Sequence, residues 1–165
     1  MCGISAYVGL NPANPDKLKL LGIYNTTRGT DACGIVINDK ITKGIKDQAN
    51  FSDFIEKNDI NCLEEHKNKI VLIHTRSASN KTTKDDPECA HPLNVTSKKN
   101  VKKLIGVHNG TLTNHIKLAK EFNVKEGKID SQTMMNILAD SDTNPKALQV
   151  LKEYDGAAAL VWYHP

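Results

Sequence analysis

The sequence predicts one globular domain in which β-strands and α-helices are mixed, an α+β chain. The length of 165 residues is close to that of one average domain. Leu, Ile, Val and Phe make up about 24% of the chain, above the level of about 20% below which disorder is expected. Short apolar runs alternate along the chain with segments of helical periodicity, and this alternation predicts the mixed class.

In the first half, the run GISAYVG predicts a strand at residues 3–9, and apolar spacing predicts a helix at 16–27. Two apolar segments at 34–38 and 41–46 predict a hairpin that turns at Asp39 and Lys40. A helix is expected to start at Ser52 and run to Lys57, and the run KIVLIHT predicts a buried strand at residues 69–75.

In the second half, the polar segment 79–92 predicts a loop, and residues 104–108 predict a strand that ends at Asn109-Gly110. Helices are expected at residues 111–122, 130–138 and 144–153, the last from its Asn-Pro start signal. The apolar run at 156–163 predicts a final strand. Polar clusters follow several of these strands, where binding and catalytic groups commonly lie.

Several classes of protein are excluded by composition. No apolar run approaches the ~18 residues of a membrane span, and the N-terminus has no secretory signal. Four cysteines in a chain of this length do not indicate a disulfide scaffold, so we expect a cytoplasmic protein. If the protein is viral, we expect it in the cytoplasm of the host. The chain has 20 Lys but only two Arg, at positions 28 and 76, and each Arg is therefore a candidate for a specific role.

Cys2 is a candidate nucleophile. If the initiator Met is removed, Cys2 carries a free α-amine, and α-amines titrate at about pH 7.7–8.0. A nucleophile and a general base then belong to one residue. Taken alone, a cysteine at the second position more often has no function.

Four further residues complete a possible site. The Asn109 amide and the Gly110 N–H can donate to one oxyanion, although Asn-Gly is also a strong turn signal. Arg76 can grip a carboxylate or form a structural ion pair. Asp130 can hold an ammonium group, cap a helix, or do both. A nucleophile, an oxyanion hole, a carboxylate clamp and an ammonium holder together suit glutamine.

The order of these motifs resembles that of the class II glutamine amidotransferases, which are N-terminal-nucleophile (Ntn) amidohydrolases. The resemblance extends over nearly the whole chain, and the nearest likeness is to the glutaminase domain of glucosamine-6-phosphate synthase. Its matching stretches are Cys2-Gly3-Ile4, the segment from Arg28 to Gly34, His74-Thr75-Arg76, His91-Pro92, the segment from His108 to His115, and Asp130.

The resemblance implies a single glutaminase domain over residues 1–165, without an acceptor or synthetase domain. It implies a four-layer αββα sandwich of two antiparallel sheets between helical layers, shortened here at the C-terminus. Cys2 is expected to attack the glutamine side-chain amide, forming a glutamyl thioester that water hydrolyses to glutamate, with ammonia released. The remaining implied roles are oxyanion stabilisation by Asn109 and Gly110, glutamine binding by Arg76, Gly110 and Asp130, and support by Arg28, His74, Thr75 and His108.

The sequence departs from the family at four positions and in length. Ser77 stands where synthase-like members carry the Trp of a loop that covers the site, and Asn80 stands where they carry His. Ile129 and Gln132 flank Asp130 where Ser and Glu are usual. These departures affect loop closure and ammonia transfer more than the attack itself.

No cofactor or metal is expected. Cys33, Cys62 and Cys89 lack CxxC spacing, and together with His91, His108 and His115 they fit no standard zinc pattern. Cys33 is expected to be a small core residue. The basic run from Ser97 to Lys103 lacks Arg and interleaved aromatic residues, so it reads as a solvated loop rather than a nucleic-acid contact.

Three functions stay open at this point. The first is a glutaminase subunit that supplies ammonia to a separate synthetase or aminotransferase-type partner. The second is an inactive homologue that binds glutamine or regulates a partner. The third is an Ntn enzyme for another γ-glutamyl or small amide. An uncovered strand edge near the C-terminus would also favour a partner chain or a homo-oligomer.

Overall fold

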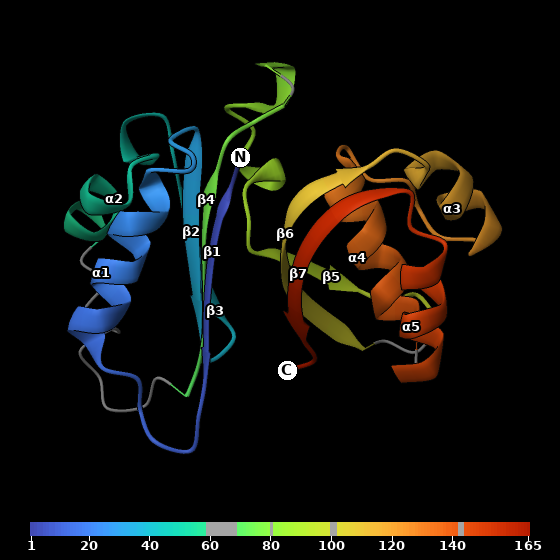
Figure 1. Cartoon of the computed structure of the whole chain (residues 1–165), viewed down its shortest axis with the longest axis horizontal. Helices are drawn as coiled ribbons and strands as arrows, with labels where there is room; N and C mark the ends of the chain where they lie inside the picture. The colour runs from blue at the N-terminus through green and yellow to red at the C-terminus, as the bar shows by residue number, and fades with distance from the viewer. Residues whose placement is uncertain (59–68, 80, 100–101, 142–143) are drawn as a thin grey trace. The chain divides into compact units, whose positions relative to one another are not determined.

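The computed structural model describes residues 1–58, 69–79, 81–99, 102–141 and 144–165, so Cys62 and Asn80 lie outside the described residues. The chain divides into two compact units, Met1–Pro92 and Leu93–Pro165. Each unit consists of one antiparallel sheet with helices (Figure 1). None of the helices in the described ranges is both long enough and apolar enough to cross a bilayer.

The first unit is built on a four-stranded sheet. Its antiparallel strands lie in the order β1 (Gly3–Val8), β4 (Ile70–Arg76), β2 (Ala32–Ile37) and β3 (Lys40–Ile45). In the register, Gly3 faces Thr75 and Ala32 faces Arg76. The start of β1, the start of β2 and the end of β4 therefore lie together at one end of the sheet.

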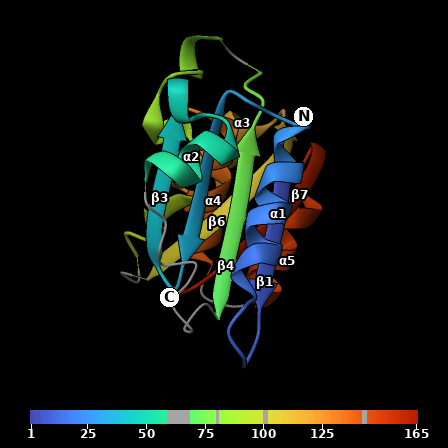
Figure 2. The ribbon, with the colours of Figure 1, turned by 90° about the vertical axis from the view of Figure 1, so that its left-hand side faces the viewer.

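Two helices cover one face of this sheet, α1 (Pro15–Thr26) and α2 (Phe51–Lys57) (Figure 2). Each begins at an asparagine cap: Asn14 accepts the Lys17 N–H at 3.0 Å, and Asn50 accepts the Ser52 N–H at 2.9 Å. The core between helices and sheet contains Leu18, Ile35, Phe51, Phe54 and Ile73, all nearly fully buried. This burial of apolar surface fixes the register of the strands that carry the site.

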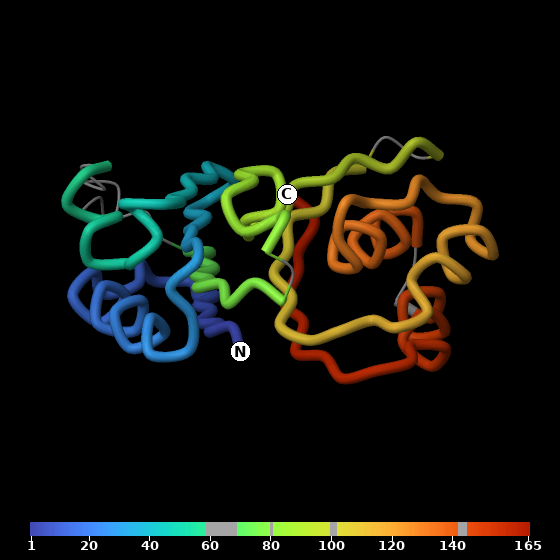
Figure 3. Tube along the Cα trace, turned by 90° about the horizontal axis from the view of Figure 1, so that it is seen from above, coloured from blue at the N-terminus to red at the C-terminus, as the bar shows by residue number. Residues whose placement is uncertain are grey.

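The second unit has a three-stranded sheet in the order β5 (Leu93–Thr96), β6 (Lys103–Leu112) and β7 (Gly156–Tyr163). Helix α4 (Asp130–Asp140) packs on β5 and β6, and α3 (His115–Glu121) and α5 (Asn144–Lys152) contact α4 (Figure 3). Met134, Met135 and Leu138 of α4 are buried against Leu104 and Leu112 of β6 in one core cluster.

The elements expected from the sequence are largely confirmed, with three corrections. The hairpin turns at Asn38 and Asp39, which have φ of 42° and 75°, one residue earlier than expected. Strand β6 does not end at Asn109-Gly110 but continues to Leu112, so α3 begins at His115 rather than Thr111. Strand β5 was not expected at all, because its four residues LNVT contain no apolar run and follow a polar segment.

The expected loop at 79–92 holds only single 3₁₀ turns among the residues described there, at Lys81–Thr83 and Pro87–Cys89. A third 3₁₀ turn, Lys46–Gln48, links β3 to the segment before α2. The last predicted strand is confirmed at both ends, Gly156 and Tyr163. Its apolar run is long enough to be recognised without any tertiary information.

Candidate active site

Cys2 lies directly before β1 and is half-buried. Because Gly3 pairs with Thr75, Cys2 is brought beside the residue that follows β4. The Ser77 backbone N–H lies 3.3 Å from the Cys2 Sγ, and the Ser77 carbonyl oxygen lies 3.7 Å from it. A backbone N–H at this distance can donate a hydrogen bond to the sulfur.

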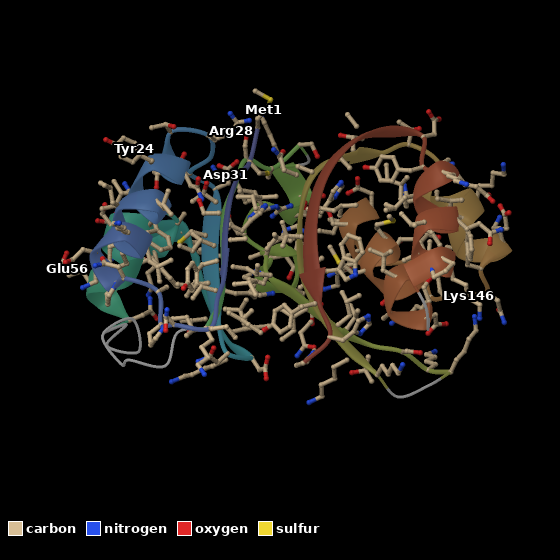
Figure 4. All side chains as sticks on the ribbon, turned by 60° about the horizontal axis from the view of Figure 1, so that its bottom comes forward. Met1, Tyr24, Arg28, Asp31, Glu56 and Lys146 are labelled. Atoms are coloured by element: carbon tan, nitrogen blue, oxygen red, sulfur yellow. The ribbon has the colours of Figure 1, made fainter. Side chains whose placement is uncertain are left out.

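Arg28 holds the backbone of the candidate nucleophile. Its Nε donates to the Cys2 carbonyl oxygen at 2.9 Å, and its Nη2 lies 3.8 Å from the Met1 Sδ. Figure 4 shows Met1 and Arg28 side by side at one end of the first unit. Met1 itself is 80% exposed. The supporting role predicted for Arg28 has a contact that can perform it.

Arg76, the predicted carboxylate clamp, is buried at the end of β4. Its Nη1 donates to the Thr83 carbonyl oxygen at 2.6 Å, and its Nη2 donates to the Thr83 hydroxyl at 2.8 Å. The two terminal nitrogens of the guanidinium thus grip the segment that follows β4. A substrate carboxylate has to share or replace these contacts.

A second contact fastens the same segment. Asp31 accepts the Ala78 N–H at 2.8 Å and pairs with the Lys84 ammonium at 3.0 Å. Burial alone would raise the pKa of Asp31, but the Ala78 N–H and the Lys84 ammonium outweigh it and lower that pKa. Asp31 lies in the predicted motif from Arg28 to Gly34, although no role was assigned to it from the sequence.

His74 and Thr75 of β4 are fully buried supports within the first unit. The Thr75 hydroxyl donates to the Asn25 carbonyl oxygen at 2.6 Å, which ties the end of α1 to the sheet beside Gly3. The His74 ring stacks on the His91 ring with centroids 4.3 Å apart. These contacts fix the end of β4 that carries Arg76.

In the second unit, Asn109 and Gly110 lie within β6, opposite Ala159 and Ala158 of β7. They are therefore strand residues, and the alternative reading of Asn-Gly as a turn is wrong. A Cβ at Gly110 would overlap the Ala157 carbonyl oxygen and lie 2.8 Å from the His108 Nε2. Glycine at this position thus allows a close approach of β6 and β7.

Asp130 is the first residue of α4, and its carboxylate faces β6. Its Oδ2 accepts the Leu112 N–H at 2.8 Å, and its Oδ1 accepts the Ser131 N–H at 2.9 Å. The N-cap of the helix is Ile129, so the expectation that Asp130 caps α4 is not met. A carboxylate has about four acceptor positions, which leaves capacity for an ammonium ligand.

His108 lies close to Gly110 and contacts Ser131, the neighbour of Asp130. Its Nδ1 lies 2.7 Å from the Ser131 Oγ, and its Nε2 lies 2.9 Å from the Tyr154 hydroxyl. Sequence reasoning named His108 but missed Ser131 and Tyr154. The only signal for Ser131 was its position beside Asp130, and Tyr154 had no signal in the sequence.

The structure therefore brings the predicted residues together in two groups. The first group lies at one end of the sheet of the first unit and consists of Cys2, Arg28, His74, Thr75 and Arg76. His108, Asn109, Gly110 and Asp130 lie together around β6 in the second unit. Within the described ranges, no group of three or more His, Cys, Asp or Glu side chains is arranged to hold a metal ion.

The other described cysteines differ from Cys2. Cys33 and Cys89 are buried, and the Cys33 thiol donates to the Gln48 carbonyl oxygen at 3.2 Å. Burial raises the pKa of Cys33 to about 12. The expectation that Cys33 is a core residue is confirmed.

These environments predict selective thiol chemistry. In a Cys62→Ser background, iodoacetamide at neutral pH should alkylate Cys2 and spare Cys33 and Cys89, because burial covers both of these thiols and the raised pKa of Cys33 keeps it from forming the reactive thiolate. Peptide mass mapping after a short exposure measures the result. Alkylation of Cys33 as fast as Cys2 in folded protein would contradict it.

His108 gives a second prediction, on stability. Burial lowers the pKa of His108 below its ordinary value of 6.5, although the Asp130 carboxylate opposes the shift. The unfolded imidazole therefore takes up a proton at a higher pH than the folded one, and stability present above about pH 6.5 is lost as the pH falls toward the folded pKa.

We expect the thermal midpoint of the wild-type protein to fall more steeply from about pH 7.5 to about pH 5.5 than that of His108→Gln, which cannot be protonated. Thermal unfolding followed by circular dichroism at each pH measures the two slopes. Equal slopes would show that His108 does not carry this proton linkage.

Comparison with known proteins supports the fold. No protein-family model matches the chain, and a search of curated protein sequences finds no significant match. Solved structures do match. The two antiparallel sheets with helices of this chain match the Ntn-hydrolase fold of these structures, which confirms the predicted α+β class.

One such structure is a glutamine phosphoribosylpyrophosphate amidotransferase from Bacillus subtilis, complexed with ADP and GMP. It matches with a TM-score of 0.71 and 21% identity, over 99% of this chain and 35% of that chain. Another, described as the allosteric regulatory enzyme of purine biosynthesis, matches with a TM-score of 0.69 and 20% identity over the same shares. This chain thus spans about a third of the length of these enzymes.

Proposed function

We propose that the chain is a glutamine amidotransferase subunit of class II. Removal of Met1 exposes the α-amine of Cys2, which takes the thiol proton as general base. The Cys2 thiolate attacks the glutamine side-chain amide, and ammonia leaves with a proton from the α-ammonium. Water then hydrolyses the glutamyl thioester to glutamate.

The position of Cys2 carries this proposal. It is the second residue of the chain, it directly precedes the first strand of an Ntn-hydrolase fold, and its sulfur lies beside a backbone N–H. A structural cysteine would lie in the core, as Cys33 does, whereas Cys2 is half-exposed.

The other roles are proposed from the residue types and their order in the sequence. Asn109 and Gly110 are proposed to donate to the oxyanion of the tetrahedral intermediate, where one such donor contributes about 3–4 kcal/mol. Arg76 is proposed to bind the α-carboxylate of glutamine, and Asp130 its α-ammonium. His74 and Thr75 support the end of β4 that carries Arg76, and Arg28 holds the backbone of Cys2.

The ammonia acceptor is proposed to be a separate synthetase or aminotransferase-type protein. One matched structure is named as a phosphoribosylpyrophosphate amidotransferase, and the match covers 35% of its length. The closer likeness to the glutaminase domain of glucosamine-6-phosphate synthase remains a prediction from the sequence motifs.

One observation favours a second candidate, a protein that binds or senses glutamine without turning it over. The Arg76 guanidinium is already occupied by Thr83, and Ser77 stands in place of the covering Trp of the synthase-like family members. A substrate carboxylate therefore has to share the Arg76 guanidinium with Thr83 or displace that contact.

Glutamate release from glutamine, followed by a coupled glutamate dehydrogenase assay, separates the two candidates. N-terminal mass analysis first confirms that Met1 is absent. The enzyme proposal expects glutamate release that depends on Cys2. Glutamine binding by calorimetry without any release, with the partner protein also present, would support the sensing candidate instead.

A further inference from the structure

A series of hydrogen bonds runs beside Gly110 of β6 and includes a residue that has no assigned role. Tyr154, in the connection between α5 and β7, places its hydroxyl 2.9 Å from the His108 Nε2. The opposite ring nitrogen, Nδ1, lies 2.7 Å from the Ser131 Oγ. His108 itself is 2% exposed, so water cannot readily replace either partner.

The directions of these bonds follow from the outer partners. The Tyr154 hydroxyl donates to the Ala157 carbonyl oxygen at 3.2 Å, so its oxygen is left to accept the His108 Nε2–H. In a neutral imidazole the other nitrogen is then an acceptor, and the Ser131 hydroxyl donates to it at 2.7 Å rather than to the Asp130 Oδ1, which lies 3.4 Å away. With this tautomer, the Tyr154 and Ser131 hydroxyls and the His108 ring N–H each have a hydrogen-bond acceptor.

At one end, the series reaches the carboxylate proposed to hold the substrate ammonium. The Ser131 N–H donates to the Asp130 Oδ1, while the Leu112 N–H donates to the Oδ2. Asp130 is thus joined to β6 in two places, directly through Leu112 and indirectly through Ser131 and His108. Movement of the His108 ring changes the support on one side of the carboxylate.

At the other end, the series reaches the backbone proposed to form the oxyanion hole. The Ala157 carbonyl that accepts the Tyr154 hydroxyl is the group that a Cβ at Gly110 would overlap. The His108 Nε2 is also within 2.8 Å of that Cβ position. The Tyr154 hydroxyl therefore bonds both groups against which Gly110 packs.

We propose that Tyr154 is a positioning residue for glutamine hydrolysis, which acts through His108 to hold the Gly110 backbone and the Asp130 carboxylate in place together. The inference rests on the proposed function. It goes beyond that function because it assigns a role to a side chain that touches no reacting atom.

The test compares Tyr154→Phe with wild type on two substrates, glutamine and 4-carbamoylbutanoate, which lacks the α-ammonium. One lost hydrogen bond predicts a fall in kcat/KM for glutamine of roughly 3- to 10-fold. The fall should be smaller for 4-carbamoylbutanoate, since it makes no use of Asp130. Ser131→Ala, which interrupts the series at its other side, should show the same ordering.

A second readout does not depend on catalysis. Imidazole ¹⁵N shifts should show the Nε2–H tautomer of His108 in wild type, and Tyr154→Phe should shift this population toward the Nδ1–H form. Tyr7→Phe is the matched control: it removes a hydroxyl that donates to the Asn11 carbonyl oxygen at 2.7 Å, in the other unit. It should change neither the kinetics nor the tautomer.

The inference is supported only if the glutamine-selective loss and the tautomer shift both occur in Tyr154→Phe. An active wild type with equal losses on both substrates, or with an unchanged tautomer, would overturn it and leave the proposed function intact. A wild-type protein that hydrolyses no glutamine would instead overturn the proposed function.

Discussion

Cys2→Ala is expected to abolish glutamine hydrolysis, with a fall in turnover of at least about 10³-fold, as is typical when a catalytic nucleophile is removed. Because Cys2 is half-exposed and its side chain is small, the substitution should leave the thermal midpoint close to that of wild type. The coupled glutamate assay and thermal unfolding measure the two quantities on the same preparation.

Cys89→Ala is the matched control, since it removes a buried thiol of the same unit that has no proposed catalytic role. It should keep turnover and lose some stability, the reverse of Cys2→Ala. Turnover that survives in Cys2→Ala would show that another group is the nucleophile.

Gly110→Ala is expected to produce the second large effect. The new Cβ would overlap the Ala157 carbonyl oxygen, so β6 and β7 must separate where they pair. The Gly110 N–H then leaves the position from which it is proposed to donate, and loss of one oxyanion donor costs about 10²- to 10³-fold in turnover. A lower thermal midpoint should accompany the loss.

Gly9→Ala is the control for adding a Cβ to a glycine. Its Cβ would meet mainly the hydroxyl end of the Tyr7 side chain, which can turn away, rather than a backbone carbonyl. Turnover should stay near the wild-type level in this variant. If Gly110→Ala hydrolysed glutamine as fast as Gly9→Ala, the oxyanion role of Gly110 would be wrong.

Much of the fold could be predicted because local signals agree with the tertiary structure. The run at Gly156–Tyr163 is long, apolar and uncharged, and its bounds as a strand were predicted correctly. Helix α1 was predicted from its apolar spacing at residues 16–27, within one residue of its bounds at Pro15 and Thr26. Where such signals exist, the sequence alone was sufficient.

The errors occurred where pairing with a distant strand overrides a local signal. Asn109-Gly110 is a turn signal by composition, yet both residues pair with alanines of β7 that lie about 50 positions further along the chain. Strand β5 is held by β6 rather than by its own four residues. Neither outcome can be read from a window of ten residues.

The candidate site shows the same division. Cys2, Arg76, Asn109, Gly110 and Asp130 were named because their chemical types and their order suit one substrate. Tyr154 was missed because its role depends on a hydrogen bond across 46 positions, to a histidine whose burial is itself a tertiary property. Residues that position other residues carry little signal in a single sequence.

The proposal that Cys2 is an N-terminal nucleophile is tested most directly by intact-mass analysis after incubation with 6-diazo-5-oxo-norleucine, an electrophilic glutamine analogue. We expect a mass without Met1 that carries one adduct, and peptide mapping should place the adduct on Cys2. Prior incubation with glutamine should slow the labelling. A chain that retains Met1 and gains no adduct would contradict the proposed function.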